Sequence, residues 1–119
     1  MEIQQIAQRL YELCNQGKFE QAQKELFAKD AVSIEPQESP GFDKVTKGLD
    51  AIFEKGEKFN SMVKDFHSCK MSEPIIAGNA FALSLSMDAT MKDGSRNPMD
   101  EICVYEVKDG KIISERFFM

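Results

Sequence analysis

The sequence has no tryptophan, a single histidine and only three cysteines. One histidine among dispersed acidic residues does not supply the ligand spacing of a zinc site. Cys14, Cys69 and Cys103 lie too far apart for a CxxC metal or redox pair, and their odd number argues against a disulfide framework. Glycine-rich phosphate loops and serine-centred nucleophile elbows are also missing. We therefore expect free thiols and neither a metal nor a nucleotide cofactor.

Long hydrophobic runs and basic clusters are missing as well. No segment approaches the roughly 18 apolar residues of a membrane span, and residues 1–5 lack the basic flank and apolar run of a secretory leader. The formal charge is -5 and the pI about 4.9, and lysines and arginines alternate with acids. The electrostatic field of a protein with this net negative charge repels polyanions such as nucleic acid. We expect a cytoplasmic protein that binds neither nucleic acid nor a membrane.

What is present is the pattern of one globular domain. The 119 residues suffice for a single core, and no linker or repeat divides them, so we expect one domain over residues 1–119. Apolar residues at helical spacing predict a helix that stops at Gly17, a short second helix that Asp30 ends, and a third that starts near Gly48. Residues 31–35, bounded by Pro36, predict a strand.

From Val63 onward the apolar period changes to two. Three turn signals predict four antiparallel strands in a meander: Gly78-Asn79, Asp93-Gly94 and Asp109-Gly110. In residues 80–91 large apolar side chains alternate with small or polar ones. The small, polar face suits either water or a second sheet at close range, and on this basis we expect a homodimer.

The order of these elements, together with three short phrases, resembles the SnoaL-like proteins of the nuclear transport factor 2-like superfamily over nearly the whole chain. The phrases are Gly41-Phe42-Asp43-Lys44, Lys47-Gly48-Leu49-Asp50-Ala51-Ile52 and Asp109-Gly110-Lys111-Ile112-Ile113. The resemblance implies a cone-shaped α+β barrel, with three N-terminal helices packed on a curved, mostly antiparallel sheet around a pocket. It implies no single activity, because the superfamily includes polyketide cyclases, a ketosteroid isomerase, dehydratases and proteins without catalysis.

Comparison with the isomerase branch gives a first candidate residue. Glu35 falls where the base carboxylate of that branch precedes a proline, whereas Leu10 and Cys103 replace the two donors that would hold an enolate oxygen. Steroid-type isomerisation is therefore not expected. If Val32 and Ile34 face the core, strand alternation turns Glu35 to solvent instead.

His67 is the second candidate, because it is the only side chain whose unperturbed pKa lies near neutrality. Alternation places it on one face with Val63, Cys69 and Met71, and we expect that face to point inward. The alternative is a packed, hydrogen-bonded histidine without a catalytic role.

The last two strands supply the remaining candidates. The resemblance implies that Glu101, Cys103 and Tyr105 face the cavity, and that Glu115 lies beside Tyr105 on the last strand. Carboxylates in an apolar lining are costly unless hydrogen-bonded, so Glu101 and Glu115 would have raised pKa values or pair with partners such as His67 or Tyr105. In the opposite strand parity, Ile102 and Val104 would fill the core and Glu115 would pair with a surface lysine.

Three functions remain open at this point. The first is a binding protein for a small hydrophobic or polar-aromatic molecule, whose predicted lining residues are Leu10, Glu101, Cys103, Tyr105, Phe117 and Met119. The second is a cofactor-independent cyclase, isomerase or dehydratase in which Glu35, His67 or Glu115 moves a proton. The third is a dimeric interaction module with a filled interior. We favour the first, since the isomerase donors are missing and no other catalytic set is unambiguous.

Overall fold

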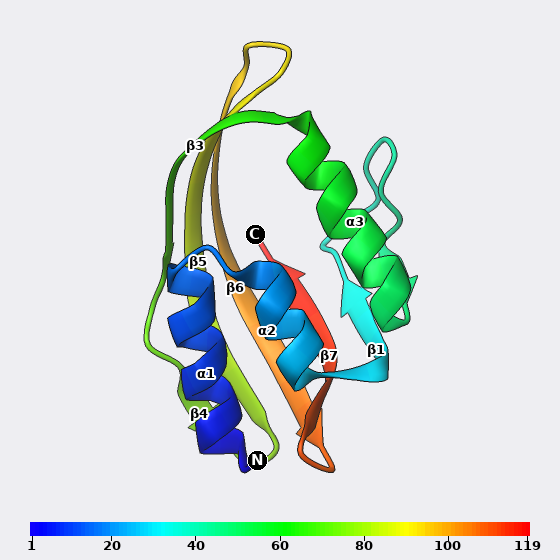
Figure 1. The fold of residues 1–119 in the computed structure, drawn as a ribbon, viewed down its shortest axis with the longest axis vertical. Coiled ribbons are helices and arrows are strands. Elements are labelled where there is room, and N and C mark those ends of the chain that lie inside the picture. The colour runs from blue at the N-terminus through cyan, green and yellow to red at the C-terminus, as the bar shows by residue number, and fades with distance from the viewer.

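The computed structural model, which describes all 119 residues, places three helices on the concave side of one curved sheet (Figure 1). The helices are α1 (Ile3–Asn15), α2 (Phe19–Leu26) and α3 (Leu49–Met62). The strands are β1 (Phe27–Ile34), β2 (Val45–Lys47), β3 (Val63–Met71), β4 (Ile75–Ala77), β5 (Ala80–Met91), β6 (Arg96–Lys108) and β7 (Lys111–Phe118). The predicted cone-shaped α+β fold is confirmed. None of the helices is both long and apolar enough to cross a membrane.

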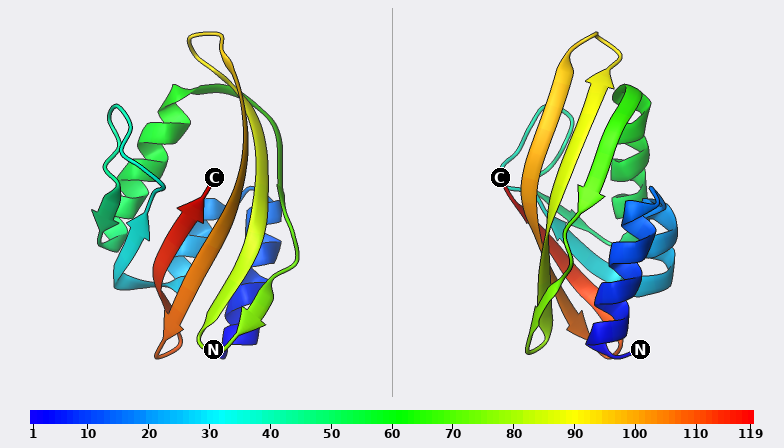
Figure 2. Two further views of the ribbon diagram at one scale, coloured as in Figure 1. Left: turned by 180° about the vertical axis from the view of Figure 1, so that it is seen from behind. Right: turned by 90° about the vertical axis from the view of Figure 1, so that its left-hand side faces the viewer.

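The sheet has the strand order β2-β1-β7-β6-β5-β3, and β4 pairs with one end of β5. All neighbours are antiparallel except β1 and β7, which run parallel. The two remaining views show that the helices lie on one side of the sheet and that no element covers the other side (Figure 2). This arrangement leaves one face for an interior and one free.

The core lies between α1, α2 and the concave face of the sheet. Helix α1 buries Ile6, Leu10 and Leu13 on one stripe, as the helical spacing predicts. Gly17, with φ +77°, then provides the left-handed residue that ends the helix. On the sheet, Phe81 and Leu83 meet this stripe as alternate residues of β5.

Fewer side chains are buried under α3 than under the other two helices. Only Ile52 of that helix is fully buried, and the side chains at positions 64–68 of β3 are exposed. The half of the cone between α3 and β3 is therefore less filled than the half between α1, α2 and the sheet.

Several predicted boundaries are wrong for local reasons. Strand β1 starts at Phe27, directly after α2, rather than at residue 31, because Phe27 and Ala31 are both buried in the sheet. The predicted strand that starts at Val63 is two strands, β3 and β4, since Pro74 has no N–H for a sheet ladder. The short strand β2 lies in a region that the sequence predicts as loop.

Candidate functional site

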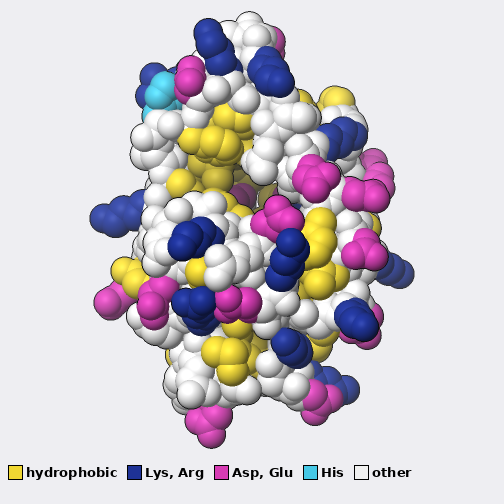
Figure 3. Space-filling view, in the orientation of Figure 1, with side chains coloured by type: hydrophobic (Ala, Val, Ile, Leu, Met, Phe, Trp, Pro, Cys, Tyr) yellow, Lys and Arg dark blue, Asp and Glu magenta, His cyan; other side chains and the backbone are white.

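The concave side of the molecule is hollowed between α2, α3 and β3 (Figure 3). Hydrophobic side chains surround this hollow, and an acidic side chain is visible at depth. Half-buried apolar residues that pack on the core from the concave face include Cys69, Met87 and Phe117. The hollow therefore lies where the packing under α3 is incomplete.

A connected set of polar side chains lies on the wall formed by β1, β7 and α3. The Ser33 hydroxyl donates to Glu115 Oε1 at 2.7 Å, and Lys55 Nζ donates to Ser33 Oγ at 2.6 Å and to Glu35 Oε1 at 2.9 Å. We call Ser33, Glu35, Lys55 and Glu115 the polar cluster. It links a fully buried carboxyl to the edge of the hollow in three hydrogen bonds.

The backbone explains why these four residues meet. Ser33 and Glu35 are two positions apart, so they lie on one side of the extended chain, and Ser33 is the direct register partner of Glu115 in the parallel pair. Lys55 follows the buried Ile52 by three residues on α3, which places both on the face that packs on β1.

Glu115 is the most deeply buried acid of the chain, with 5% of its surface exposed. Burial raises the pKa of its carboxyl, whereas the Lys55 ammonium and the Ser33 hydrogen bond act in the opposite direction. Glu35 adds a negative charge that again raises this pKa. Glu115 is thus a partly compensated buried acid, the kind of group that often takes part in function.

Glu101 lies outside this hydrogen-bonded chain but is coupled to it by charge. It is half-buried on β6, two residues from the buried Cys103. Burial raises its pKa to about 7, and the negative charges of Glu35 and Glu115 add to this effect, while Lys55 opposes it. No hydrogen bond contributes to the shift. Its carboxyl therefore exchanges a proton near neutral pH.

A small cavity of about 30 Å³ lies under α1 and α2, and we call it the deep pocket. Its lining residues are Leu10, Cys14, Phe19, Ala22, Gln23, Phe27, Tyr105 and Glu115. Only Phe19 and Gln23 among them are partly exposed, so the pocket opens beside the N-terminal half of α2. Glu115 thus belongs to both the polar cluster and the deep pocket.

The Tyr105 ring is held rigidly at the pocket. It stacks on Phe81 with ring centroids 5.0 Å apart and meets Phe27 edge-on at 6.4 Å. Tyr105 and Glu115 are direct register partners on β6 and β7. Burial raises the pKa of the Tyr105 phenol well above its ordinary value, so it acts as a hydrogen-bond donor and not as a base.

The three thiols are free, as expected, but they are not activated. Burial raises the pKa of Cys14 to about 12 and raises the pKa of Cys103 as well. A protonated thiol is a weak nucleophile, so neither residue is placed to attack a substrate. The structure also contains no group of three or more His, Cys, Asp or Glu side chains with the arrangement of a metal site.

The structure brings most of the predicted site residues to one region. Glu35 and Glu115 belong to the polar cluster, and Leu10, Tyr105 and Glu115 line the deep pocket. Cys103 is buried on the same face of β6 as Glu101 and Tyr105, and Phe117 is its register partner on β7. The alternative parity is wrong, because Ile102 is 53% exposed on the outer face.

Two predicted positions are not brought to this region. His67 is exposed and its Nε2 lies 2.6 Å from Thr90 Oγ1, so the expectation that it points inward is wrong. The pairing of β3 with β5 is irregular between Val63 and Asp65 and again between Phe66 and Ser68. These irregularities break the simple alternation on which that expectation rests. Met119 is 73% exposed and does not line the interior.

Two members of the polar cluster, Ser33 and Lys55, are missing from the predicted set, and Glu115 pairs with Ser33 rather than with His67 or Tyr105. For Ser33 a signal is present, since it shares strand parity with Glu35 and Ala31. For Lys55 the helical spacing from Ile52 and Leu49 is the only indication.

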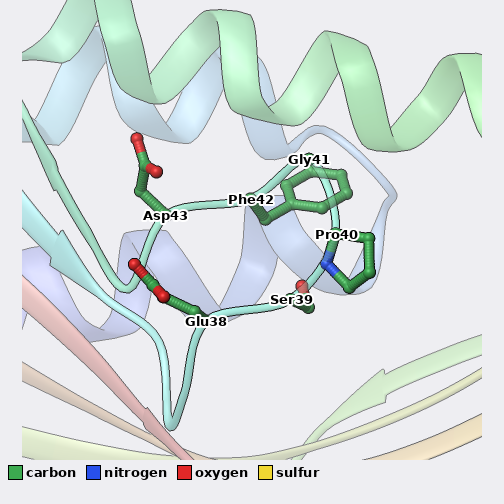
Figure 4. Close-up of a pocket in the computed structure, with 6 residues that line it drawn as sticks. All are labelled: Glu38, Ser39, Pro40, Gly41, Phe42 and Asp43. Carbon is green, nitrogen blue, oxygen red and sulfur yellow. The ribbon is translucent and has the colours of Figure 1, made fainter.

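A second, wider hollow of about 520 Å³ lies within the loop that joins β1 to β2. It is lined only by consecutive loop residues, Glu38 to Asp43, whose side chains are spread along the loop (Figure 4). Lys58 of α3 lies over the Phe42 ring, 5.0 Å from its centroid, and donates to the Gly41 carbonyl. The loop is thus fixed to α3, and its polar groups do not converge as those of the polar cluster do.

The comparisons with known proteins agree with this fold. A family model, the SnoaL-like domain, matches residues 1–119. A structure from Mesorhizobium loti, provisionally named a SnoaL-like polyketide cyclase, is similar at 35% identity with a TM-score of 0.92, and the match covers 100% of both chains. No curated protein gives a significant match.

Two more distant structures share the fold alone. An NTF2-like protein of unknown function from Burkholderia pseudomallei is 15% identical, with a TM-score of 0.81 over 98% of this chain and 88% of that one. A ketosteroid isomerase-like protein from Catenulispora acidiphila, solved with trimethylamine, is 13% identical, with a TM-score of 0.69 over 96% of this chain and 84% of that one. The full-length family match and the 35% identity over the whole chain show that this protein belongs to the SnoaL-like domain family.

Proposed function

We propose that this protein binds a small, partly polar organic molecule in the hollow between its helices and the concave face of the sheet. The observation that carries the proposal is the convergence of the polar cluster and Glu101 on an otherwise apolar interior. A few oriented polar groups among apolar walls are the usual composition of a small-molecule site.

The buried acids favour this function over a purely structural interior. Burying a carboxyl among apolar side chains opposes folding, even when hydrogen bonds offset part of the cost. The chain carries such groups at Glu115 and Glu101, and burial raises the pKa of both. A filled interior that served only as a dimer scaffold would be more stable with apolar residues at these positions.

A fragment screen tests the proposal. We expect small aromatic and alicyclic compounds with one or two polar groups to raise the Tm of the wild-type protein. The affinity of the best compound should fall at least fivefold in Lys55→Met, which keeps the side-chain stem but removes the ammonium group. Lys58→Met is the matched control, because Lys58 lies one turn further along α3 and contacts only the loop that joins β1 to β2.

A screen in which no compound raises the Tm or perturbs the interior NMR signals would contradict the proposal. Equal losses of affinity in Lys55→Met and Lys58→Met would show that the polar cluster takes no part in binding.

A second candidate function, cofactor-independent proton transfer, is favoured by Glu101. Its pKa of about 7 matches the condition under which a side chain both gives and takes a proton efficiently at neutral pH. Exchange of deuterium into the α-carbon of a small ketone such as 2-tetralone would measure this activity. We expect exchange above the buffer rate in the wild type and in Glu106→Gln, and loss of exchange in Glu101→Gln. Equal rates with and without protein would contradict it.

A further inference from the structure

Two buried polar side chains meet at the end of the deep pocket with hydrogen-bonding capacity left over. Glu115 and Tyr105 are 5% and 3% exposed, and both line the pocket. Only Oε1 of Glu115 accepts the Ser33 hydroxyl. The Cys103 thiol, two residues from Tyr105 on the same face of β6, is at most a weak partner for the phenol. A ligand group in the pocket therefore meets one carboxyl oxygen and one phenol.

The size of the pocket limits that group to a small part of a ligand. Its volume of about 30 Å³ is far below the roughly 300–1,000 Å³ of a pocket that holds a whole ligand. The remaining walls are apolar, among them Leu10, Ala22 and Phe27, except for the partly exposed Gln23 at the opening. A ring does not fit in this space, but the polar end of a larger ligand does.

The charges around Glu115 favour a neutral group over a cation. Lys55 already lies on the other side of Ser33, 2.6 Å from its hydroxyl, and supplies positive charge to the buried carboxyl. A ligand ammonium would add a second positive charge and would lose its hydration among apolar walls.

Among neutral groups, a hydroxyl matches these two partners best, because it donates one hydrogen bond and accepts up to two. It donates to Glu115 when the carboxyl is ionised, accepts from it when the carboxyl is protonated, and accepts from Tyr105 in both states. A ketone or an ether only accepts, so it loses its Glu115 hydrogen bond when the carboxyl ionises.

We infer that the deep pocket is a recognition subsite for the hydroxyl group of an alcohol, held between Glu115 Oε2 and the Tyr105 hydroxyl. The inference rests on the proposed function, since the remainder of the alcohol lies in the hollow, outside the opening beside Phe19 and Gln23.

A matched series of one-ring compounds tests this specificity: benzyl alcohol, benzyl methyl ether, benzaldehyde, benzylamine and toluene. Titrations followed by ¹H–¹⁵N NMR at pH 6 and pH 8 give the affinity of each compound. We expect benzyl alcohol to bind at least five times more tightly than benzylamine and toluene at both pH values, and more tightly than benzaldehyde and benzyl methyl ether wherever the Glu115 carboxyl is ionised. Tyr105→Phe should lower the affinity for benzyl alcohol about five- to tenfold, which is the effect of one lost hydrogen bond. The affinity for toluene should stay unchanged.

Glu115→Gln and Ser84→Ala complete the set of variants. The first replaces the carboxyl by an amide of the same shape, and the second changes an exposed side chain on the outer face of β5. Ser84→Ala should bind benzyl alcohol like the wild type, and Glu115→Gln should bind it with less preference over toluene. If Glu115→Gln does not fold, Tyr105→Phe alone decides the matter.

Three results would overturn the inference: tighter binding of benzylamine or benzaldehyde than of benzyl alcohol, equal binding of toluene, or an unchanged alcohol affinity in Tyr105→Phe. If the fragment screen finds other ligands of the hollow while benzyl alcohol binds no more tightly than the other compounds of its series, only the hydroxyl subsite is contradicted. If no compound of either set binds, the proposed function falls with it.

Discussion

At the scale of single residues, Glu101 gives the clearest dependence of stability on pH. Its pKa is about 7 in the folded protein, above the ordinary value of 4.5, so the folded state retains a proton that the unfolded chain releases. Stability is therefore lost as the pH rises from about 4.5 through 7, and the loss is complete above that range.

We predict that Glu101→Gln, which mimics the protonated acid, is more stable than the wild type at pH 8 by about 1–3 kcal/mol, allowing for partial solvent exposure of the side chain. The difference should vanish near pH 4. Urea unfolding at both pH values measures it. Glu106→Gln, an exposed position on the outer face of the same strand, is the control. An advantage of Glu101→Gln that is the same at both pH values would argue against the raised pKa.

Lys55 gives a second prediction at this scale. It is the only cation in the polar cluster, and its Nζ contacts both Ser33 and Glu35. Lys55→Met leaves the buried Glu115 without a counter-ion, so we expect a loss of about 1–3 kcal/mol at pH 7. The loss should be smaller at pH 5, because without Lys55 the pKa values of Glu101 and Glu115 rise and both acids are protonated more readily.

Denaturant unfolding of Lys55→Met and Lys58→Met compares the two lysines directly. Lys58 is exposed and its contacts are with the surface loop, so its replacement should cost less than about 1 kcal/mol. Similar losses in the two variants would show that the cluster does not depend on Lys55.

At the scale of elements, α3 contains a glycine that the fold does not require. A methyl group at Gly56 meets no atom within 4 Å, and the residue has ordinary helical geometry. We predict that Gly56→Ala stabilises the protein by about 0.5–1 kcal/mol, since alanine loses less conformational entropy in a helix.

Gly48→Ala is the contrasting variant at the start of the same helix. Gly48 has φ +93°, a conformation that side chains other than glycine rarely adopt, so this variant should be destabilised. Thermal unfolding of both variants should show a higher Tm for Gly56→Ala and a lower Tm for Gly48→Ala than for the wild type. A loss of stability in Gly56→Ala would mean that α3 is bent or packed differently from the structure described.

The sequence predicts the elements better than it predicts their faces. The turns at Gly78, Asp93 and Asp109 lie where expected because their chemistry is local. The parallel pairing of β1 with β7 and the irregular pairing of β3 are set by contacts far apart in the chain. An irregularity shifts the alternation of the side chains that follow it. His67 falls between Phe66 and Ser68, at the second of the two irregularities of β3, and for this reason it lies outside.

The same distinction applies to the candidate site. Glu35 and Glu115 are identified from strand alternation and from the family resemblance, whereas Lys55 reaches them from a helix 20 residues away from Glu35. Nothing in the local pattern of α3 says which strand it covers. The ion pair at the edge of the hollow therefore follows only from the three-dimensional arrangement.

At the scale of the whole molecule, the outer face of the sheet is uncovered by any helix (Figure 2). Ile102 and Phe118 are register partners on this face and are 53% and 47% exposed, next to the small side chain of Ser84. Such a paired apolar patch favours association, and we propose a homodimer through this face.

Light scattering after gel filtration tests the dimer. We expect a mass twice that of the 13.5 kDa chain for the wild type and a monomer for Ile102→Asp. Met62→Asp, at a methionine that is 42% exposed at the end of α3 and so on the helix side of the sheet, should remain dimeric. A monomeric wild-type protein at micromolar concentration would contradict the proposal.

The central claim, that the hollow between helices and sheet receives a small molecule, is tested most directly by the methyl signals of the seven methionines. Met87 and Met99 are half-buried register partners on β5 and β6, whereas Met1 is 62% exposed at the N-terminus. With ¹³C-methyl-methionine protein and the best compound of the fragment screen, we predict saturable shifts of Met87 and Met99 while Met1 stays unchanged. Shifts confined to exposed methionines, or no saturable shift of Met87 and Met99, would contradict binding in the interior.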